Sequence, residues 1–335
     1  GVHKRFMPLA RGFDDFYGFV NTGIDYYTHE RYGVPSMYRN NSPTIADKGT
    51  YCTDLFEREA VRFLEANHQK PFFLYLPFNA PHGASNLDPA IRTGAQAPKK
   101  FKELYPKLQA QAGTEQRKRS RYGDKLYTVP NRAARRLEFV GSVTAMDAAI
   151  GRVLGLLDQY NIADNTLVIF FSDNGGGGAS DNTPLRGGKG QMFEGGLRVP
   201  CIIRWPGRVP AGKTSDAFLT TLEIFPTLLQ ASDVKPPQDI IFDGFDLLPV
   251  LQGKTPSPRN AMFWQRRHDV GARVGDWKWV DSNRGSGLFN LTTDIGEKQD
   301  LSATHPGKLA ELKQHFAHWK KHMYAAEPRG PFRDF

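Results

Sequence analysis

Residues 167–175 read Leu167-Val168-Ile169-Phe170-Phe171-Ser172-Asp173-Asn174-Gly175. The apolar run over Leu167–Phe171 is typical of a strand that is buried on both faces, as strands of parallel sheets are. A polar Asp-Asn-Gly turn follows at the carboxyl end of this strand. Upstream, apolar residues recur at three- and four-residue steps from Leu137 to Leu157, which predicts an amphipathic helix. A helix followed by a fully buried strand indicates an α/β fold.

The same alternation of helix and strand extends outward from this stretch. The apolar pattern predicts a helix over Asp54–Asn67, a short strand over Phe72–Leu76 and a further strand over Val199–Trp205. We therefore expect a mainly parallel central sheet flanked by helices. In such a sheet ligands gather beyond the carboxyl ends of the strands, where His82 and Asp173 lie.

The C-terminal part of the chain has a different pattern. From about Met262 it consists of short strand-like pieces, among them Trp277–Val280 and Leu288–Leu291. A closing helix is predicted to begin near Pro306, because proline suits the first helical position and apolar residues follow at helical spacing. Residues 262–335 are therefore predicted to form a small α+β subdomain with antiparallel strands.

The preceding residues, 1–261, form one predicted domain with a basic insertion over residues 84–133. Residues 99–136 hold 12 Lys and Arg against 3 Asp and Glu, so they account for the whole net charge of +9. Such a block is either a solvated surface segment or a binding surface for a polyanion. No nucleic-acid-binding motif accompanies it, so nucleic acid is not expected, and a sulfated polysaccharide would suit the same positive charge. No apolar run approaches the ~18 residues of a membrane span.

Three features at predicted strand ends could carry chemistry. Asp173 and Asn174 offer a carboxylate and an amide oxygen, which suit Ca²⁺ or Mg²⁺, although an Asn-Gly turn needs no ligand. Lys189 lies in the glycine-rich run Leu185–Gly190 and either meets an oxyanion or is a surface lysine. His82 either donates a hydrogen bond to an anionic substrate, protonates a leaving oxygen, or is structural.

Four motifs follow one another along the chain: Arg11-Gly12-Phe13-Asp14-Asp15-Phe16-Tyr17-Gly18, Asn79-Ala80-Pro81-His82, Ser172-Asp173-Asn174-Gly175, and Gly187-Gly188-Lys189 with Glu194-Gly195-Gly196-Leu197-Arg198-Val199-Pro200. In this order they resemble the motifs of the formylglycine-dependent sulfatases, arylsulfatase-like members of the alkaline-phosphatase superfamily. Gly275–Lys278 and Gly287–Leu291, then Asp294 and Glu297 ahead of Asp300-Leu301, are similar to the C-terminal subdomain of that family. The resemblance implies an alkaline-phosphatase-like α/β fold.

The resemblance also implies a function and a set of site residues. It implies a sulfuric ester hydrolase whose substrate is a sulfated carbohydrate or another sulfate ester. Asp173 and Asn174 would bind Ca²⁺ rather than Mg²⁺. Lys189 and His82 would contact the sulfate group of the substrate. Members of this family are exported, so a periplasmic or secreted location is expected.

One part of the family pattern is missing. Such sulfatases carry their nucleophile in a C/S-x-P-x-R motif, whose Cys or Ser is oxidised to formylglycine. Neither Cys52 nor Cys201 is followed by that pattern, so we expect none of the residues of this chain to be the nucleophile. The paired N-terminal aspartates of the family are also absent. We therefore expect a chain that is truncated at its N-terminus and inactive alone, with a neighbouring strand exposed by loss of the first strand.

Two other functions stay open. A phosphate-ester hydrolase of the same superfamily would share the sheet, but it would need two metals with Asp and His ligands. No His-rich spacing downstream of Asp173 matches such a set. A non-catalytic protein that binds sulfated glycans would use the basic insertion without a nucleophile.

Overall fold

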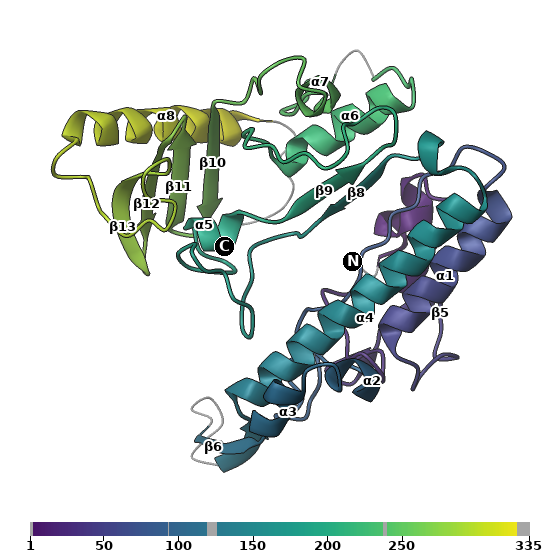
Figure 1. Cartoon of the computed structure of the whole chain (residues 1–335). Helices are drawn as coiled ribbons and strands as arrows, with labels where there is room; N and C mark the ends of the chain where they lie inside the picture. The colour runs from purple at the N-terminus through teal and green to yellow at the C-terminus, as the bar shows by residue number, and fades with distance from the viewer. Residues whose placement is uncertain (1–2, 93, 119–125, 237–239, 327–335) are drawn as a thin grey trace. The chain divides into compact units, whose positions relative to one another are not determined.

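The computed structural model describes residues 3–92, 94–118, 126–236 and 240–326. The chain divides into two compact units (Figure 1). Unit 1 comprises residues 1–163 with 178–180, and unit 2 comprises residues 164–177 with 181–335. The boundary predicted between residues 261 and 262 lies inside unit 2 and stays a prediction.

Two long helices form the frame of unit 1. They are α1 (Cys52–Asn67) and α4 (Arg132–Gln159), which pack side by side (Figure 1). Both lie where the spacing of apolar residues predicts a helix. Asn131 caps α4, because its side chain accepts a hydrogen bond from the Ala134 amide at 2.8 Å. The other elements before α1 are short: η1 (Lys4–Phe6), η2 (Pro8–Arg11), β1 (Tyr17–Phe19), β2 (Glu30–Arg31), β3 (Val34–Pro35), β4 (Met37–Arg39) and β5 (Ser42–Pro43).

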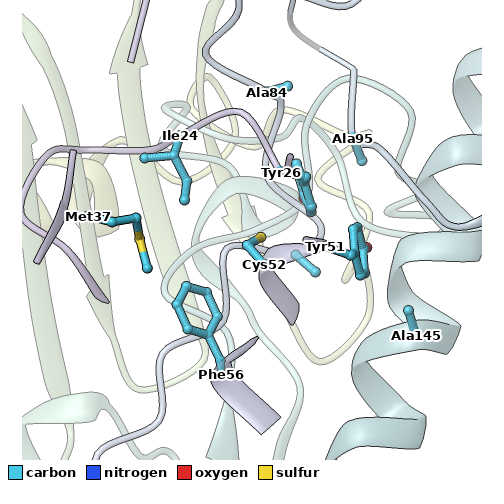
Figure 2. Packing of buried hydrophobic residues seen from close by; sticks show 10 residues of the cluster. Ile24, Tyr26, Met37, Tyr51, Cys52, Phe56, Ala84, Ala95 and Ala145 are labelled. Carbon is cyan, nitrogen blue, oxygen red and sulfur yellow. The ribbon is translucent and has the colours of Figure 1, made fainter. Parts of the chain in front are cut away.

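The core of unit 1 forms where α1 meets α4 and the loops beside them. Figure 2 shows its buried side chains, with Cys52 and Phe56 from α1 and Ala145 from α4. Tyr26 and Tyr51 stack in this core with their ring centroids 5.6 Å apart. Because α4 contributes a small side chain here, the aromatic residues fill the space beside it.

Residues 72–76 differ from the sequence prediction. No strand is formed there, because the segment hydrogen-bonds to no neighbouring strand among the described residues. Exposure nevertheless alternates along it as in a half-buried strand, since Phe73 and Tyr75 are 57% and 64% exposed while Phe72, Leu74 and Leu76 are partly buried. The side chains therefore follow a strand pattern, and the backbone lacks a strand partner.

The predicted basic insertion, residues 84–133, contains a few short elements between α1 and α4. They are α2 (Lys99–Lys102), α3 (Pro106–Gln111), β6 (Thr114–Lys118) and β7 (Leu126–Pro130). Both α2 and α3 pack against α4, and β6 pairs with β7 as an antiparallel hairpin. Residues 119–125 hold part of the predicted basic charge and lie outside the described residues.

The first strands of unit 2 lie where the sequence places them, but they pair differently. β8 (Val168–Phe171) and β9 (Cys201–Arg204) are antiparallel, with Val168 opposite Arg204. All strand pairs among the described residues are antiparallel, so the predicted parallel pairing is not observed among them. β8 has one strand partner in this part of the chain and is half-buried rather than buried on both faces.

The C-terminal part of unit 2 has the predicted α+β character. Its antiparallel sheet runs in the order β10 (Ala261–Arg266), β11 (Asp269–Val274), β12 (Trp277–Ser282) and β13 (Gly285–Asn290). α8 (Pro306–Ala325) lies across this sheet and buries Leu312 and Phe316 against it (Figure 1). The connecting segments contain η3 (Ala163–Asn165), α5 (Glu194–Leu197), η4 (Thr221–Glu223), α6 (Ile224–Ala231) and α7 (Leu248–Leu251).

One helix of the described residues, α4, is long and apolar enough to cross a membrane by length and composition. This property is weak evidence for a membrane span, because core helices of folded domains share it. In this structure α4 packs against α1, α2 and α3.

Candidate active site

The loop after β8 carries the two predicted metal ligands. Ser172 Oγ donates a hydrogen bond to the Asn174 carbonyl oxygen at 3.0 Å, and Asn174 Nδ2 donates to the Gly175 carbonyl oxygen at 3.1 Å. These two bonds fix the turn and use the amide nitrogen of Asn174, so its Oδ1 remains as an acceptor. Asp173 is exposed.

The donor atoms of this loop fit a hard divalent cation in part. A carboxylate and an amide oxygen are ligands that Ca²⁺ prefers, and Ca²⁺ takes about 6 to 8 oxygens. Within the described parts of the chain no group of three or more His, Cys, Asp and Glu side chains could hold a metal ion. Asp173 and Asn174 can therefore supply two ligands, and the remaining ligands would have to be other oxygens.

A second loop, residues 186–196, packs directly against the first, residues 172–177. The Gly175 amide donates to the Gly196 carbonyl oxygen at 3.0 Å, and the Lys189 amide donates to the Gly176 carbonyl oxygen at 3.0 Å. Asn182 Nδ2 donates to the same Gly176 oxygen at 2.8 Å. The backbone of Lys189 is therefore fixed beside the loop that carries Asp173 and Asn174.

Glycines make this close approach possible. A Cβ on Gly175 would stand 2.0 Å from the Gly195 carbonyl oxygen, and one on Gly188 would stand 2.6 Å from the Gly176 carbonyl oxygen. A Cβ on Gly196 would stand 2.5 Å from the Gly188 carbonyl oxygen. Real side chains do not reach such distances, so each position excludes any larger residue in this backbone arrangement.

Lys189 itself combines a fixed backbone with an exposed side chain. Its Cβ would be 3.1 Å from a Cβ on Gly177, so the base of the side chain also lies against the first loop. The residue as a whole is exposed. An ammonium group in this setting can meet an anion from solvent.

His82 is held through its backbone in unit 1. Tyr26 Oη donates to the His82 carbonyl oxygen at 2.8 Å, and the His82 amide donates to the Asn79 carbonyl oxygen at 2.8 Å. The ring Nδ1 lies 2.8 Å from the Gly83 carbonyl oxygen. A carbonyl can only accept, so Nδ1 carries the hydrogen, and Nε2 accepts in the neutral ring and donates in the charged one.

The structure thus brings together part of the predicted site. Asp173, Asn174 and Lys189 lie on two interlocked loops of unit 2. His82 belongs to unit 1. The convergence of all four side chains on one anion and one cation stays a prediction.

The C-terminal resemblance includes Lys278 and Glu297, but the sequence analysis did not predict the buried charge cluster that they form beside the second loop. Lys278 Nζ lies 2.7 Å from Glu194 Oε1 and 2.9 Å from Glu297 Oε1. The side chains of Lys278 and Glu297 are 0% exposed. The available signal was a lysine between two tryptophans, Trp277 and Trp279, in a predicted strand, where a charged side chain needs a buried partner.

A family model described as Sulfatase matches residues 2–234. The chain belongs to the sulfatase family. The chain is 30% identical over 305 residues to the N-acetylgalactosamine-6-sulfatase of Canis lupus familiaris, and the matched region covers 84% of this chain and 51% of the relative. The chain spans about half the length of the curated relatives it matches first.

Solved structures resemble this sulfatase over nearly the whole chain. The crystal structure of Ps i-CgsB in complex with k-i-k-neocarrahexaose superposes with a TM-score of 0.76 at 28% identity, covering 94% of this chain and 68% of that one. A structure in complex with its substrate D-glucosamine-2-N,6-O-disulfate has a TM-score of 0.66 at 21% identity and covers 95% of this chain and 78% of that one. The predicted fold class, alkaline-phosphatase-like α/β, is confirmed by these similarities.

Proposed function

We propose that this sulfatase chain is part of an enzyme that hydrolyses sulfate esters of a sulfated carbohydrate. The observation that carries the proposal is the interlock of residues 172–177 with residues 186–196, which fixes Lys189 beside Asp173 and Asn174. A cation and two hard oxygen ligands on adjoining loops suit a substrate that is an anionic ester. The family membership supports the same chemistry.

Each predicted site residue of the chain has a separate task in this proposal. The Lys189 ammonium would hold a sulfate oxygen and stabilise the charge that develops there as the ester bond breaks. His82 would donate from Nε2 to the sulfate or leaving oxygen when its ring is charged, since Nδ1 is bound to the Gly83 carbonyl oxygen. The rigid backbone at both residues would limit the reorganisation that the reaction requires.

Asp173 and Asn174 would hold Ca²⁺ through their side-chain oxygens. When bound, the ion would neutralise charge on the ester oxygens. Removal of Ca²⁺ with a chelator is expected to abolish hydrolysis, and added Ca²⁺ to restore it. A periplasmic or secreted location, which we propose from the family resemblance, would suit this requirement because Ca²⁺ is abundant outside cells.

The nucleophile is proposed to lie outside these residues. Burial raises the pKa of the Cys52 thiol well above its ordinary value, and Cys52 is fully buried in the core of unit 1. A buried thiol of high pKa is a poor nucleophile. Cys201 is exposed, but burial of its thiol raises its pKa too, and Cys201-Ile202-Ile203-Arg204 lacks the C-x-P-x-R pattern.

A sulfated carbohydrate is proposed as the substrate class for two reasons. The relatives reported above include an N-acetylgalactosamine-6-sulfatase and a structure solved with neocarrahexaose. The insertion over residues 84–133 also places exposed cations, among them Lys100 and Lys107, near α4. Exposed cations attract a polyanion over a range that salt screens.

A substitution tests the proposed reaction. In the full-length protein with Ca²⁺ present, Lys189→Ala is expected to lower kcat/KM for 4-nitrophenyl sulfate by about 100-fold or more, because a charge that stabilises the transition state is lost. Lys213→Ala removes another exposed lysine of unit 2 and serves as the matched control, with no change expected. Hydrolysis of 4-nitrophenyl phosphate in preference to the sulfate would indicate the phosphate-ester alternative. Binding of heparin without hydrolysis of either ester would indicate a glycan-binding protein.

A further inference from the structure

Glu297 has an unusual position beneath the glycine-rich loop. Its side chain is 0% exposed, and its backbone has a φ of 51°, in the left-handed region that residues other than glycine rarely adopt. Asp294 supports this turn, since its carbonyl oxygen accepts the Glu297 amide at 3.1 Å. A strained, fully buried carboxylate persists only where the surrounding contacts over-determine it.

Those contacts join Glu297 to both ends of the loop over residues 186–196. At the beginning of the loop, Arg186 Nη1 donates to the Glu297 carbonyl oxygen at 2.9 Å. At its end, the Glu194 amide donates to Glu297 Oε2 at 2.6 Å. The two ends also bind each other, because the Gly195 amide donates to the Arg186 carbonyl oxygen at 2.7 Å. Glu297 thus bridges the base of a loop whose middle carries Lys189.

Lys278 of β12 provides the opposite charge. Its ammonium donates to Glu194 Oε1 at 2.7 Å and lies 2.9 Å from Glu297 Oε1, which has no hydrogen-bond partner among the described residues. Burial raises the pKa of Glu297, and the charge of Lys278 opposes this rise. One ammonium between two buried carboxylates makes the cluster sensitive to removal of either partner.

We propose that Glu297 is a positioning residue of the sulfatase site, which fixes both ends of the loop over residues 186–196 and thereby places Lys189. This inference rests on the proposed function only for the role of Lys189. The link from Glu297 to the loop is geometric and holds for any ligand that Lys189 binds. The C-terminal sheet, through Lys278 of β12, and the turn after β13, through Glu297, accordingly help to place the site, although both residues lie about a hundred residues downstream of Lys189 in the sequence.

The chain offers a matched control for this proposal. Glu223 is also fully buried and ion-paired, with Arg259 Nε donating to its Oε1 at 2.9 Å. It is held within unit 2 by Thr220 and Arg259, and among the described residues it forms no hydrogen bond or ion pair with residues 186–196. Glu223→Gln and Glu297→Gln therefore remove comparable buried charges, and only the second acts on the loop.

The first experiment is amide hydrogen exchange on the full-length protein, which requires no activity. Glu297→Gln is expected to speed exchange of the Lys189 and Gln191 amides by about tenfold or more relative to amides of β11. The reason is that the substitution weakens the buried hydrogen bond from the Glu194 amide to the Glu297 carboxylate. Glu223→Gln should leave that ratio unchanged. If Glu297→Gln fails to fold, Arg186→Met tests the same link from the other end of the loop. An unchanged ratio in the folded variant would overturn the proposal.

The second experiment is a double-mutant cycle on hydrolysis of 4-nitrophenyl sulfate by the full-length protein. Glu297→Gln is expected to lower kcat by about tenfold with a smaller change in KM, since a displaced lysine costs stabilisation of the transition state. In the Lys189→Ala background the same substitution should change kcat by less than about twofold. Equal losses in both backgrounds would refute positioning through Lys189. If the protein hydrolyses no sulfate ester, the proposed function fails while the exchange experiment still decides the placement of the loop.

Discussion

Gly175 lies at one of the backbone contacts between the two loops of the site. Because a Cβ on Gly175 would stand 2.0 Å from the Gly195 carbonyl oxygen, Gly175→Ala must displace the second loop. We expect a loss of about 1–3 kcal/mol in the free energy of unfolding of unit 2, as for other overpacked sites, together with loss of hydrolysis. Urea unfolding followed by tryptophan fluorescence measures the first effect.

Gly177 allows a milder substitution between the same two loops. A Cβ there would meet Lys189 Cβ at 3.1 Å, a distance that a shift of a few tenths of an ångström relieves. Gly177→Ala should therefore change stability less than Gly175→Ala and still reduce kcat/KM, because it moves the base of Lys189. Equal stability losses in the two variants would show that the loops do not interlock as described.

The sequence located the polar residues of the site but not their supports. Asp173, Asn174 and Lys189 stand in short motifs beside glycines, so their chemistry is readable from residue type. Glu297 and Lys278 reach the site through a tertiary contact that joins residues far apart in the chain. No local pattern encodes such a contact, although the isolated charge within a tryptophan-rich strand and the C-terminal resemblance both pointed to these residues.

At the level of the helices, the middle of α4 is buried through small residues, while the predicted Leu137 and Leu157 are buried nearer its two ends. The sequence predicts a face that includes Val140, Val143 and Ile150, and these residues are half-buried. The fully buried positions include Gly141 and Ala145 instead. The period of the helix was readable, but the choice of face depends on which neighbours approach, and those belong to α1 and α2.

A pair of alanine substitutions in α4 tests this packing. A Cβ on Gly141 would stand 2.9 Å from Ala97 Cβ, whereas one on Gly151 would meet nothing within 4 Å. Gly151→Ala is expected to stabilise unit 1 by about 0.5–1 kcal/mol through helix propensity alone. Gly141→Ala gains the same propensity but is expected to be destabilising by about 1 kcal/mol or more because of the contact. Urea unfolding followed by far-ultraviolet circular dichroism compares them, and a stabilised Gly141→Ala would contradict the close approach.

Strand prediction failed in a different way at the same scale. β8 and β9 formed where the sequence places them because each is the other's partner. Residues 72–76 kept the alternating exposure of a strand without forming one, since a strand exists only through hydrogen bonds to a neighbour. The pattern of a segment thus specifies which side chains are buried, while the partner strand determines whether the backbone pairs.

At the scale of the whole molecule, we expect acid to destabilise unit 1 more than unit 2. In unit 1, hydrogen bonds from Arg58 hold the pKa of Asp47 at about 2, and Arg58 reaches both carboxylate oxygens at 2.8 and 3.0 Å. Burial would raise the pKa of Glu59, yet hydrogen bonds from Arg39 and Arg62 lower it to about 2. In unit 2 burial raises the pKa of Glu297, whereas hydrogen bonds from Ser302 and Leu288 lower the pKa of Asp300.

These shifts set the sign of the pH dependence. A carboxyl group whose pKa is lower in the folded state than in the unfolded state stabilises the fold at pH values above its unfolded-state pKa, which is near 4. That stability is lost as the pH falls toward 2. Asp47 and Glu59 therefore make unit 1 sensitive to acid. The raised pKa of Glu297 has the opposite sign, because its contribution is lost as pH rises.

The chain carries separate reporters for the two units. All five tryptophans lie in unit 2, and Cys52 is buried in the core of unit 1. The thiol of Cys52 can be labelled with dithiodipyridine, which reacts with thiols in acid, in a Cys201→Ser background. The urea concentration at the midpoint of this labelling should decrease when the pH is lowered from 6 to 3. Tryptophan fluorescence should give a smaller fall. Asp47→Asn removes one of the titrating groups and should lessen the fall at Cys52. If both probes shift equally and Asp47→Asn changes neither shift, the arginine–carboxylate network does not control the acid stability of unit 1.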